Sequence, residues 1–261
     1  MAAAAGESVV SPAIPPDFEW IRRGRRVALV RRTVAGPVGD LLARTPHGPP
    51  PGGERLAGGR GAAYRVRLPG SDTVVFRVCR RGGLLAALLR DNYLRLWPRL
   101  PRPFAEIVVT ETARARGVPG PEPLGARIDR GWAGWYRGVV VTRHLPAAES
   151  LWERLHREAD AGGRREIAHA AGRAIGMLWR AGIYHPDLNL WNCVVSDEGG
   201  GLEAFIVDFD RASIVEGGAR EALRERMLRR LERSARKLDP SGKIVTGRDL
   251  QALRDASGMA P

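Results

Sequence analysis

Four polar side chains crowd into one short segment, YHPDLNLWNCVV (residues 184–195), between an apolar helix-like run and a valine pair. Asp187 and Asn192 lie five residues apart, and Asp208 follows after a second apolar run. Phosphoryl transfer needs a carboxylate to orient an attacking hydroxyl and accept its proton, and it needs oxygen ligands for Mg²⁺. We therefore predict Asp187 as the catalytic residue and Asn192 and Asp208 as the metal ligands.

Two further residues of this segment have other interpretations. His185 is predicted as a structural brace, because a histidine in such a loop more often holds it by hydrogen bonds than moves protons. Asn189 could contact the loop backbone, a substrate or neither. A solvated turn with a capping side chain would also explain Asp187, but the second acidic motif downstream favours chemistry.

The elements that must position these residues follow from hydrophobic periodicity and turn signals. A hairpin of residues 192–196 and 203–208 would hold Asn192 and Asp208 side by side. Strands dominate the first 145 residues and helices dominate the rest. Strands are predicted within 20–32, 62–68, 73–79 and 135–145, and a loop at 47–59. Helices are predicted at 84–97, 103–117, 165–183, 220–238 and 248–257.

Composition narrows the classes of protein that remain. A net charge of +13, from 42 basic and 29 acidic residues, favours an anionic partner such as nucleic acid, a phosphate-bearing ligand or a membrane surface. An arginine-rich composition can also reflect a GC-rich genome. Two cysteines, Cys79 and Cys193, are too few for a disulfide framework or a cysteine zinc site, and both are predicted in the core. No long apolar run and no signal sequence is present, so a cytoplasmic location is expected.

The order of these motifs carries a family resemblance. H-P-D-L-N-L-W-N and D-F-D (208–210) resemble the catalytic loop H-R-D-x-x-x-x-N and the D-F-G metal motif of protein-kinase-like enzymes. Pro186 and Asp210 depart from the pattern, as is common in small-molecule and sugar kinases of this fold. Further segments, including GGRGAAYRV, VVVTRHLPAAESL and IVDFDRA, resemble the 3-deoxy-D-manno-octulosonic acid (Kdo) kinases. These are lipopolysaccharide-core sugar kinases, with the heptose kinases as near relatives.

This resemblance implies an α+β, protein-kinase-like fold with two lobes. After a flexible N-terminus (1–16), a strand-rich nucleotide-binding lobe would span 17–145 and a helical catalytic lobe 146–261. ATP and Mg²⁺ would be the cofactors, and the Kdo sugar on lipid A would be phosphorylated at its 4-hydroxyl. The enzyme would work at the cytosolic face of a bacterial inner membrane, in peripheral contact with the anionic surface. A nucleic-acid partner is not expected.

One departure from the kinase pattern concerns the strand lysine that contacts the nucleotide phosphates. No lysine precedes Lys237, so we predict that Arg77 of TVVFRVC takes this role. Its helix partner would be Glu106, with Glu111 as second choice. Arginine in place of lysine raises the alternatives of slow turnover or of a non-catalytic site, and the intact Asp187 motif argues against the latter.

A glycine-rich segment, GGRGA (58–62), precedes the first strand of the 62–79 hairpin. Its position predicts that Gly59, Arg60 and Gly61 cover nucleotide phosphates. It lacks the Gly-Lys-Ser/Thr ending of a Walker A loop.

Several alternatives remain at the level of sequence. The helix at 84–97 could lie in a membrane interface or pack on its lobe. The helix at 220–238 is expected to bury Leu223, Met227 and Leu231, while its arginines are either solvated or face anionic groups. The acceptor could instead be heptose or an aminoglycoside. The chain could also be a nucleotide-binding pseudokinase, a basic scaffold or an arginine-rich nucleic-acid-binding protein.

Overall fold

The chain folds into two compact units in the computed structural model. The structure describes residues 13–56, 62–70, 72–79, 93–94, 100–132, 135–215 and 221–258. We call Ser11–Glu111 with Pro121–His144 the sheet unit, and Thr112–Gly120 with Leu145–Pro261 the helical unit. The α+β fold class predicted from the sequence is confirmed.

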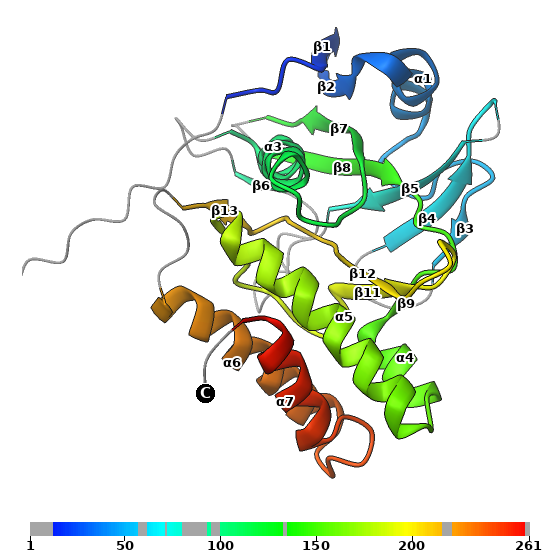
Figure 1. The fold of residues 1–261 in the computed structure, drawn as a ribbon. Coiled ribbons are helices and arrows are strands. Elements are labelled where there is room, and N and C mark those ends of the chain that lie inside the picture. Colours follow the sequence, from blue (N-terminus) through cyan, green and yellow to red (C-terminus); the bar gives the residue numbers. More distant parts are fainter. Residues whose placement is uncertain are drawn as a thin grey trace, which may run out of the picture. The chain divides into compact units, whose positions relative to one another are not determined.

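The sheet unit is built on one antiparallel sheet (Figure 1). The strand order is β1-β2-β7-β8-β5-β4-β3, and β6 pairs with β8. The strands are β1 (Phe18–Arg23), β2 (Arg26–Arg31), β3 (Glu54–Arg55), β4 (Ala62–Arg67), β5 (Thr73–Val78), β6 (Tyr93–Leu94), β7 (Pro123–Arg130) and β8 (Trp135–Arg143). The helical elements are η1 (Arg32–Val34), α1 (Ala35–Arg44) and α3 (Arg102–Ala115). The predicted 62–79 hairpin, the strand at 135–145 and the helix at 103–117 are confirmed.

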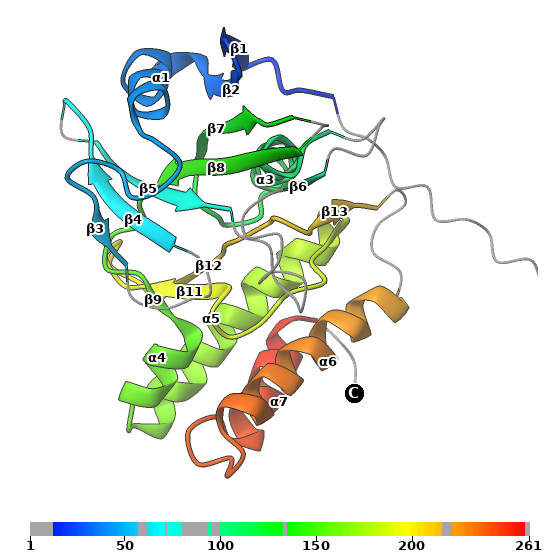
Figure 2. The same cartoon turned by 180° about the vertical axis from the view of Figure 1, so that it is seen from behind.

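Both faces of this sheet are covered, which explains its nearly continuous apolar strands. Along β2, Ala28 and Val30 belong to the core that includes Val38 and Leu42 of α1. The alternate β2 residues belong to a second core, which includes residues of α3. The two helices can be followed in Figures 1 and 2.

Helix α1 was not predicted, because Gly36, Pro37 and Gly39 interrupt its apolar pattern. Two arginines of the sheet hold its C-terminal end, where helix carbonyls lack partners. Arg127, only 1% exposed, donates hydrogen bonds to the backbone oxygens of Leu42 and, at 2.7 Å, Thr45. Arg26 donates to the oxygen of Ala43. Contacts distant in sequence therefore fix this helix.

The helical unit combines two small sheets with four helices among its described residues (Figure 2). Its strands are β9 (Glu149–Ser150), β10 (Ile183–Tyr184), β11 (Cys193–Ser196), β12 (Glu203–Ile206) and β13 (Ser213–Ile214). Its helices are α4 (Leu151–Arg157), α5 (Ala161–Arg180), α6 (Glu221–Leu238) and α7 (Gly247–Ala256). The predicted helices at 165–183, 220–238 and 248–257 are confirmed. Helix α4 was missed, although Ser150 and Glu153 form the capping box that its sequence signals.

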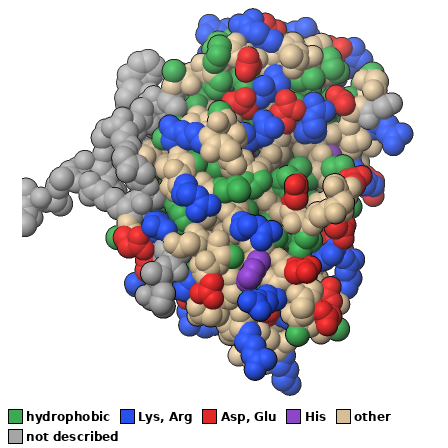
Figure 3. Space-filling model, viewed as in Figure 1, with side chains coloured by type: hydrophobic (Ala, Val, Ile, Leu, Met, Phe, Trp, Pro, Cys, Tyr) green, Lys and Arg blue, Asp and Glu red, His purple; other side chains and the backbone are tan. Residues whose placement is uncertain are grey.

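Helix α6 buries the predicted stripe of Leu223, Met227 and Leu231. It lies beside α7 in both views (Figures 1 and 2), and Arg254 joins the two helices. The Arg254 guanidinium is 3.2 Å from Glu225 and 2.7 Å from Glu232. Elsewhere, basic and acidic side chains are interspersed over the face in Figure 3.

Some predictions lie outside the described residues. Most of the helix predicted at 84–97 is among them, and it is wrong at Tyr93–Leu94, which form β6 and pair with β8. The loop predicted at 47–59 contains the short strand β3. Both cysteines are buried, as predicted, and burial raises the pKa of the Cys193 thiol to about 12. No helix in the described part of the chain has the length and apolarity needed to cross a membrane.

Helices α5 and α7 approach each other closely at two glycines of α5. A Cβ atom added at Gly172 would clash with the Leu253 backbone oxygen and come within 2.7 Å of the Ala256 Cβ. One added at Gly176 would lie 2.7 Å from the backbone oxygen of Ser257. The absence of side chains at these two positions thus allows the helices to cross.

We expect Gly172→Ala to lower the free energy of unfolding by about 1–3 kcal/mol, because α7 must move away from α5. Gly36→Ala in α1 is the control, since a Cβ there meets nothing within 4 Å. The control should be neutral or slightly stabilising. Urea unfolding of both variants makes the comparison, and equal stabilities would contradict the close helix crossing.

Candidate functional site

The segment between β10 and β11 forms a loop held by its own amide side chains. Asn189 Nδ2 donates to the backbone oxygen of Asp187 at 2.7 Å, and Asn192 Nδ2 donates to the same oxygen at 3.1 Å. Asn189 Oδ1 accepts hydrogen bonds from the backbone N–H groups of Trp191 (2.8 Å) and Asn192 (3.3 Å). Asn189, whose role the sequence left open, therefore fixes the backbone that carries Asp187.

Asn192 and Asp208 stand at the open end of the β11–β12 hairpin. Cys193 pairs with Ile206 in register, and the N–H of Val207 donates to the Asn192 backbone oxygen at 2.9 Å. The predicted hairpin is thus confirmed. Asp208 has a left-handed backbone with φ 63°, a conformation that Asp tolerates better than most side chains and that is common at functional sites.

The donor chemistry of this pair fits Mg²⁺. The Nδ2 end of the Asn192 amide bonds to the loop backbone, so its Oδ1 end is the one that can serve a metal. Among the described residues, no group of three or more His, Cys, Asp or Glu side chains could hold a metal ion. A Mg²⁺ held by Asn192 and Asp208 would therefore take further oxygen ligands from nucleotide phosphates and water.

His185 is fully buried beneath the loop. Its backbone N–H donates to Met227 Sδ at 3.1 Å, its Nε2 lies 3.4 Å from the Val207 oxygen, and its ring centroid is 5.6 Å from that of Phe209. Burial lowers the pKa of the imidazole, although Asp208 acts in the opposite direction. The His185 ring thus contacts the segment that follows β12, and its backbone N–H contacts α6.

Arg211 is the residue of this site that the sequence reasoning missed. Its Nη1 lies 3.3 Å from Asp187 Oδ2, with the Arg211 side chain 59% exposed and that of Asp187 37% exposed. The sequence signal that could have identified Arg211 is its place in DFDRA, where this basic residue directly follows the second acidic motif. The contact with Arg211 directs the Asp187 carboxylate to one side of the loop.

The sheet unit brings Arg77 and Glu106 together. Arg77 Nη2 donates to both carboxylate oxygens of Glu106, whose side chain is only 5% exposed. Val74, Phe76 and Val78 of β5 lie in the core shared with α1, so strand alternation directs Arg77 towards α3.

Glu111, the second-choice partner of Arg77, pairs with a different arginine. Its Oε2 lies 2.5 Å from Arg31 Nη2. Arg31 Nε also lies 3.2 Å from Glu122, and its guanidinium carbon is 4.7 Å from the centroid of the Phe18 ring. The two carboxylates of α3 thus serve separate arginines. The predicted phosphate-covering residues Gly59, Arg60 and Gly61 lie outside the described residues.

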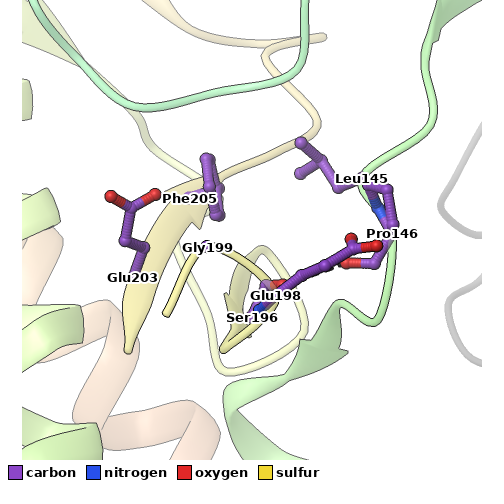
Figure 4. A pocket seen from close by; sticks show the side chains of 7 residues that line it. All are labelled: Leu145, Pro146, Ser196, Glu198, Gly199, Glu203 and Phe205. Atoms are coloured by element: carbon purple, nitrogen blue, oxygen red, sulfur yellow. Dashed lines mark hydrogen bonds between the residues drawn. The ribbon is translucent and has the colours of Figure 1, made fainter. Parts of the chain in front are cut away.

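A cavity of about 290 Å³ lies at the turn end of the β11–β12 hairpin, away from Asn192 and Asp208. Its lining is shown in Figure 4 and comprises Leu145, Pro146, Ser196, Glu198, Gly199, Glu203 and Phe205. No residue predicted for the site lines this cavity. The Ser196 hydroxyl donates to the Pro146 oxygen at 3.0 Å and ties the hairpin to the connector after β8.

Known proteins resemble the chain over most of its length. Residues 57–256 match the model of the lipopolysaccharide kinase (Kdo/WaaP) family. A 3-deoxy-D-manno-octulosonic acid kinase of Xanthomonas oryzae pv. oryzae is 36% identical over 205 residues, which cover 78% of each chain. That of Stenotrophomonas maltophilia is 34% identical over 204 residues, again 78% of each. A solved structure described as WaaP in complex with acyl carrier protein has a TM-score of 0.53 at 17% identity, covering 80% of this chain and 79% of that one. At this identity the similarity concerns the fold.

Proposed function

The chain belongs to the lipopolysaccharide kinase (Kdo/WaaP) family, and from this premise we propose that it phosphorylates the 4-hydroxyl of the Kdo sugar on lipid A, with ATP as the donor. A phosphotransferase that acts on a sugar hydroxyl of the lipopolysaccharide core follows from the family itself. The particular hydroxyl and the lipid-linked acceptor are our proposal. The observation that carries it is the loop in which Asn189 and Asn192 bond to the Asp187 backbone while Asn192 pairs with Val207, the neighbour of Asp208.

In this proposal, Asp187 orients the acceptor hydroxyl and accepts its proton as the new phosphorus–oxygen bond forms and the bond from the γ-phosphorus to the departing ADP breaks. Its backbone oxygen is held by two amides, so its carboxylate is positioned before the acceptor arrives. Asn192 and Asp208 would hold Mg²⁺, which neutralises phosphate charge when bound. His185 would brace the loop from below.

On the nucleotide side, we propose that Arg77 contacts the phosphates and that Glu106 orients its guanidinium. Arginine can bind phosphate oxygens through two parallel N–H groups. Gly59, Arg60 and Gly61 would cover the same phosphates. Residues 17–145 would thus act as the nucleotide-binding lobe and residues 146–261 as the catalytic lobe, at the cytosolic face of the inner membrane.

The test is phosphoryl transfer from ATP with Mg²⁺ to purified Kdo–lipid A, with the phosphorylated position assigned by NMR. We expect product at the Kdo 4-hydroxyl. A heptose-bearing core and an aminoglycoside serve as competing acceptors in parallel reactions. Preferred transfer to either, or transfer to another Kdo hydroxyl, would replace the proposed acceptor while leaving the family activity in place.

The metal assignment predicts a specific defect in Asp208→Asn. Asparagine adopts the left-handed backbone as readily as aspartate, so the turn should keep its shape while one anionic metal ligand is lost. We expect the Mg²⁺ concentration for half-maximal activity to rise by about tenfold or more, the loss of roughly 1.4 kcal/mol of binding.

The matched control is Glu203→Gln, which removes a charge from the other end of the same hairpin. It should leave the Mg²⁺ titration unchanged. A Mg²⁺ requirement that is the same for wild type and Asp208→Asn would remove Asp208 from the metal site.

A further inference from the structure

Two turns of the sheet unit lie beside each other at one end of the sheet. The turn between β1 and β2 centres on Gly24 and Arg25, and Arg23 pairs with Arg26 across it. The other turn follows β7, where the Arg130 N–H donates to the Arg25 oxygen at 2.9 Å. Residues close to each turn therefore share one end of the sheet unit.

Trp132 stands at the tip of the turn after β7 and is 80% exposed. The other exposed large hydrophobic residues in the described chain, Trp20 and Met177, are 42% and 39% exposed. Trp20 also packs edge-on against Phe104, with ring centroids 4.9 Å apart, whereas Trp132 makes no ring contact with any described residue. An indole exposed to water at a turn contributes little to folding, and tryptophan is enriched at interfaces, where one end of the ring is apolar and the other is hydrated.

Four exposed arginines lie in these two turns or at the strand ends that lead into them. They are Arg22, Arg23, Arg25 and Arg130. Within the described ranges, none of the four forms an ion pair with a carboxylate, whereas Arg26 beside them lies 3.3 Å from Asp129. Some exposed arginines elsewhere have such partners, for example Arg65 with Glu54 at 2.5 Å and Arg44 with Asp40 at 3.3 Å, whereas others, such as Arg67 and Arg173, have none among the described residues. Positive charge is thus concentrated and uncompensated at this edge.

We propose that these four arginines and Trp132, the arginine–tryptophan edge, dock on the surface of an anionic lipid bilayer. Tryptophan is the side chain enriched at the membrane–water interface, where its ring sits at the headgroup level. Guanidinium groups around it bind lipid phosphates and gain from the negative surface potential. A nucleic-acid surface would offer several aromatic side chains along a groove, whereas this edge offers one at a projecting tip.

An enzyme whose acceptor is linked to a lipid must reach the bilayer that holds the acceptor, and docking through this edge would bring it there. In that sense the inference rests on the proposed function. Docking itself needs no turnover. It can therefore be measured on the full chain without ATP or acceptor, so each proposal can fail without the other.

The experiment is co-sedimentation with phosphatidylcholine vesicles, with and without phosphatidylglycerol. Arg22, Arg23, Arg25 and Arg130 are changed to Gln together. The control changes Arg44, Arg65, Arg157 and Arg229 to Gln, which removes the same charge from exposed positions elsewhere. We expect the wild type to bind anionic vesicles. The edge variant should bind them about fivefold more weakly for each arginine removed. The control variant should bind them nearly as tightly as the wild type. Equal losses in both variants, or wild-type binding by the edge variant, would overturn the proposal.

Trp132→Ala tests insertion separately from charge. Brominated lipids should quench the wild-type tryptophan fluorescence, and this quenching should be lost in Trp132→Ala. Unchanged quenching would overturn the placement of Trp132 in the headgroup region.

Two further measurements separate this proposal from its alternatives. If the edge substitutions weaken binding to a single-stranded RNA but not to vesicles, the partner is nucleic acid and the proposal is wrong. A water-soluble Kdo acceptor should be phosphorylated equally by the wild type and the edge variant. Failure of the wild type on that acceptor would sink the proposed function instead.

Discussion

Asp187→Asn is expected to lower kcat for phosphoryl transfer by about 10²–10⁴-fold, the usual range for loss of a positioned general base. The amide cannot accept the hydroxyl proton, and it loses its charged contact with Arg211. The loop itself should persist, because Asn189 and Asn192 bond to the backbone oxygen of residue 187 and not to its side chain. ATP affinity should therefore stay close to that of the wild type.

The measurement is single-turnover transfer to the Kdo acceptor at saturating ATP, together with nucleotide binding by calorimetry. Asp197→Asn is the matched control. Asp197 is also an exposed aspartate in an ion pair, 3.0 Å from Arg154, and it lies in the same unit. The control should keep full activity. An Asp187→Asn enzyme within a few-fold of wild type would show that another group takes the proton.

Arg211 should influence the same step through Asp187. Both side chains are substantially exposed, and an exposed ion pair contributes little to stability. Its position instead suits a role in directing the carboxylate. This contact joins residues 24 positions apart, and the sequence contains no local signal for it beyond the basic residue in DFDRA.

The elements around the site could be predicted from the sequence where local patterns were strong. The β11–β12 hairpin and α5 follow from apolar periodicity, and they place the loop between them. Helix α1 could not be found in the same way, because its stability comes from Arg26 and Arg127 reaching its C-terminal carbonyls from the sheet. Local propensity carries no information about such distant donors.

The choice between two helix carboxylates shows the same limit. Glu106 and Glu111 are both on α3, separated by roughly 7.5 Å along the axis at 1.5 Å per residue. Which of them meets Arg77 depends on the lateral position of α3 over the sheet. Sequence alone ranked the pair correctly in preferring Glu106 for Arg77, but it gave no role to Arg31, which takes Glu111.

Glu106→Gln is expected to have a large effect on stability, lowering the free energy of unfolding by about 3–5 kcal/mol. The side chain of Glu106 is 5% exposed and that of Arg77 is 23% exposed. The substitution would remove the carboxylate that bonds to the largely buried Arg77 guanidinium. Urea unfolding of the purified variant measures the loss.

A second pair of variants separates this structural cost from the proposed role in nucleotide binding. Replacing both residues together, Arg77→Met with Glu106→Leu, removes the buried charges as a pair and should recover most of the stability. Turnover should still be reduced, by roughly 10²-fold if Arg77 holds the phosphates as one electrostatic donor of the site. Full turnover in this stable double variant would remove Arg77 from the nucleotide site.

Glu111→Gln supplies the control that makes this comparison specific. Its ion pair with Arg31 is also largely buried, with the two side chains 17% and 10% exposed, and it lies in the same unit. We expect a smaller loss of stability, because Arg31 keeps its contact with Glu122 at 3.2 Å. Turnover should be unchanged below the unfolding transition, because Arg31 is not placed among the nucleotide contacts. If Glu111→Gln lowered turnover as much as Glu106→Gln, the effect would come from general loosening of the sheet unit. A loss of turnover confined to variants of the Arg77–Glu106 pair would instead show that an arginine makes the phosphate contact for which protein kinases use a lysine.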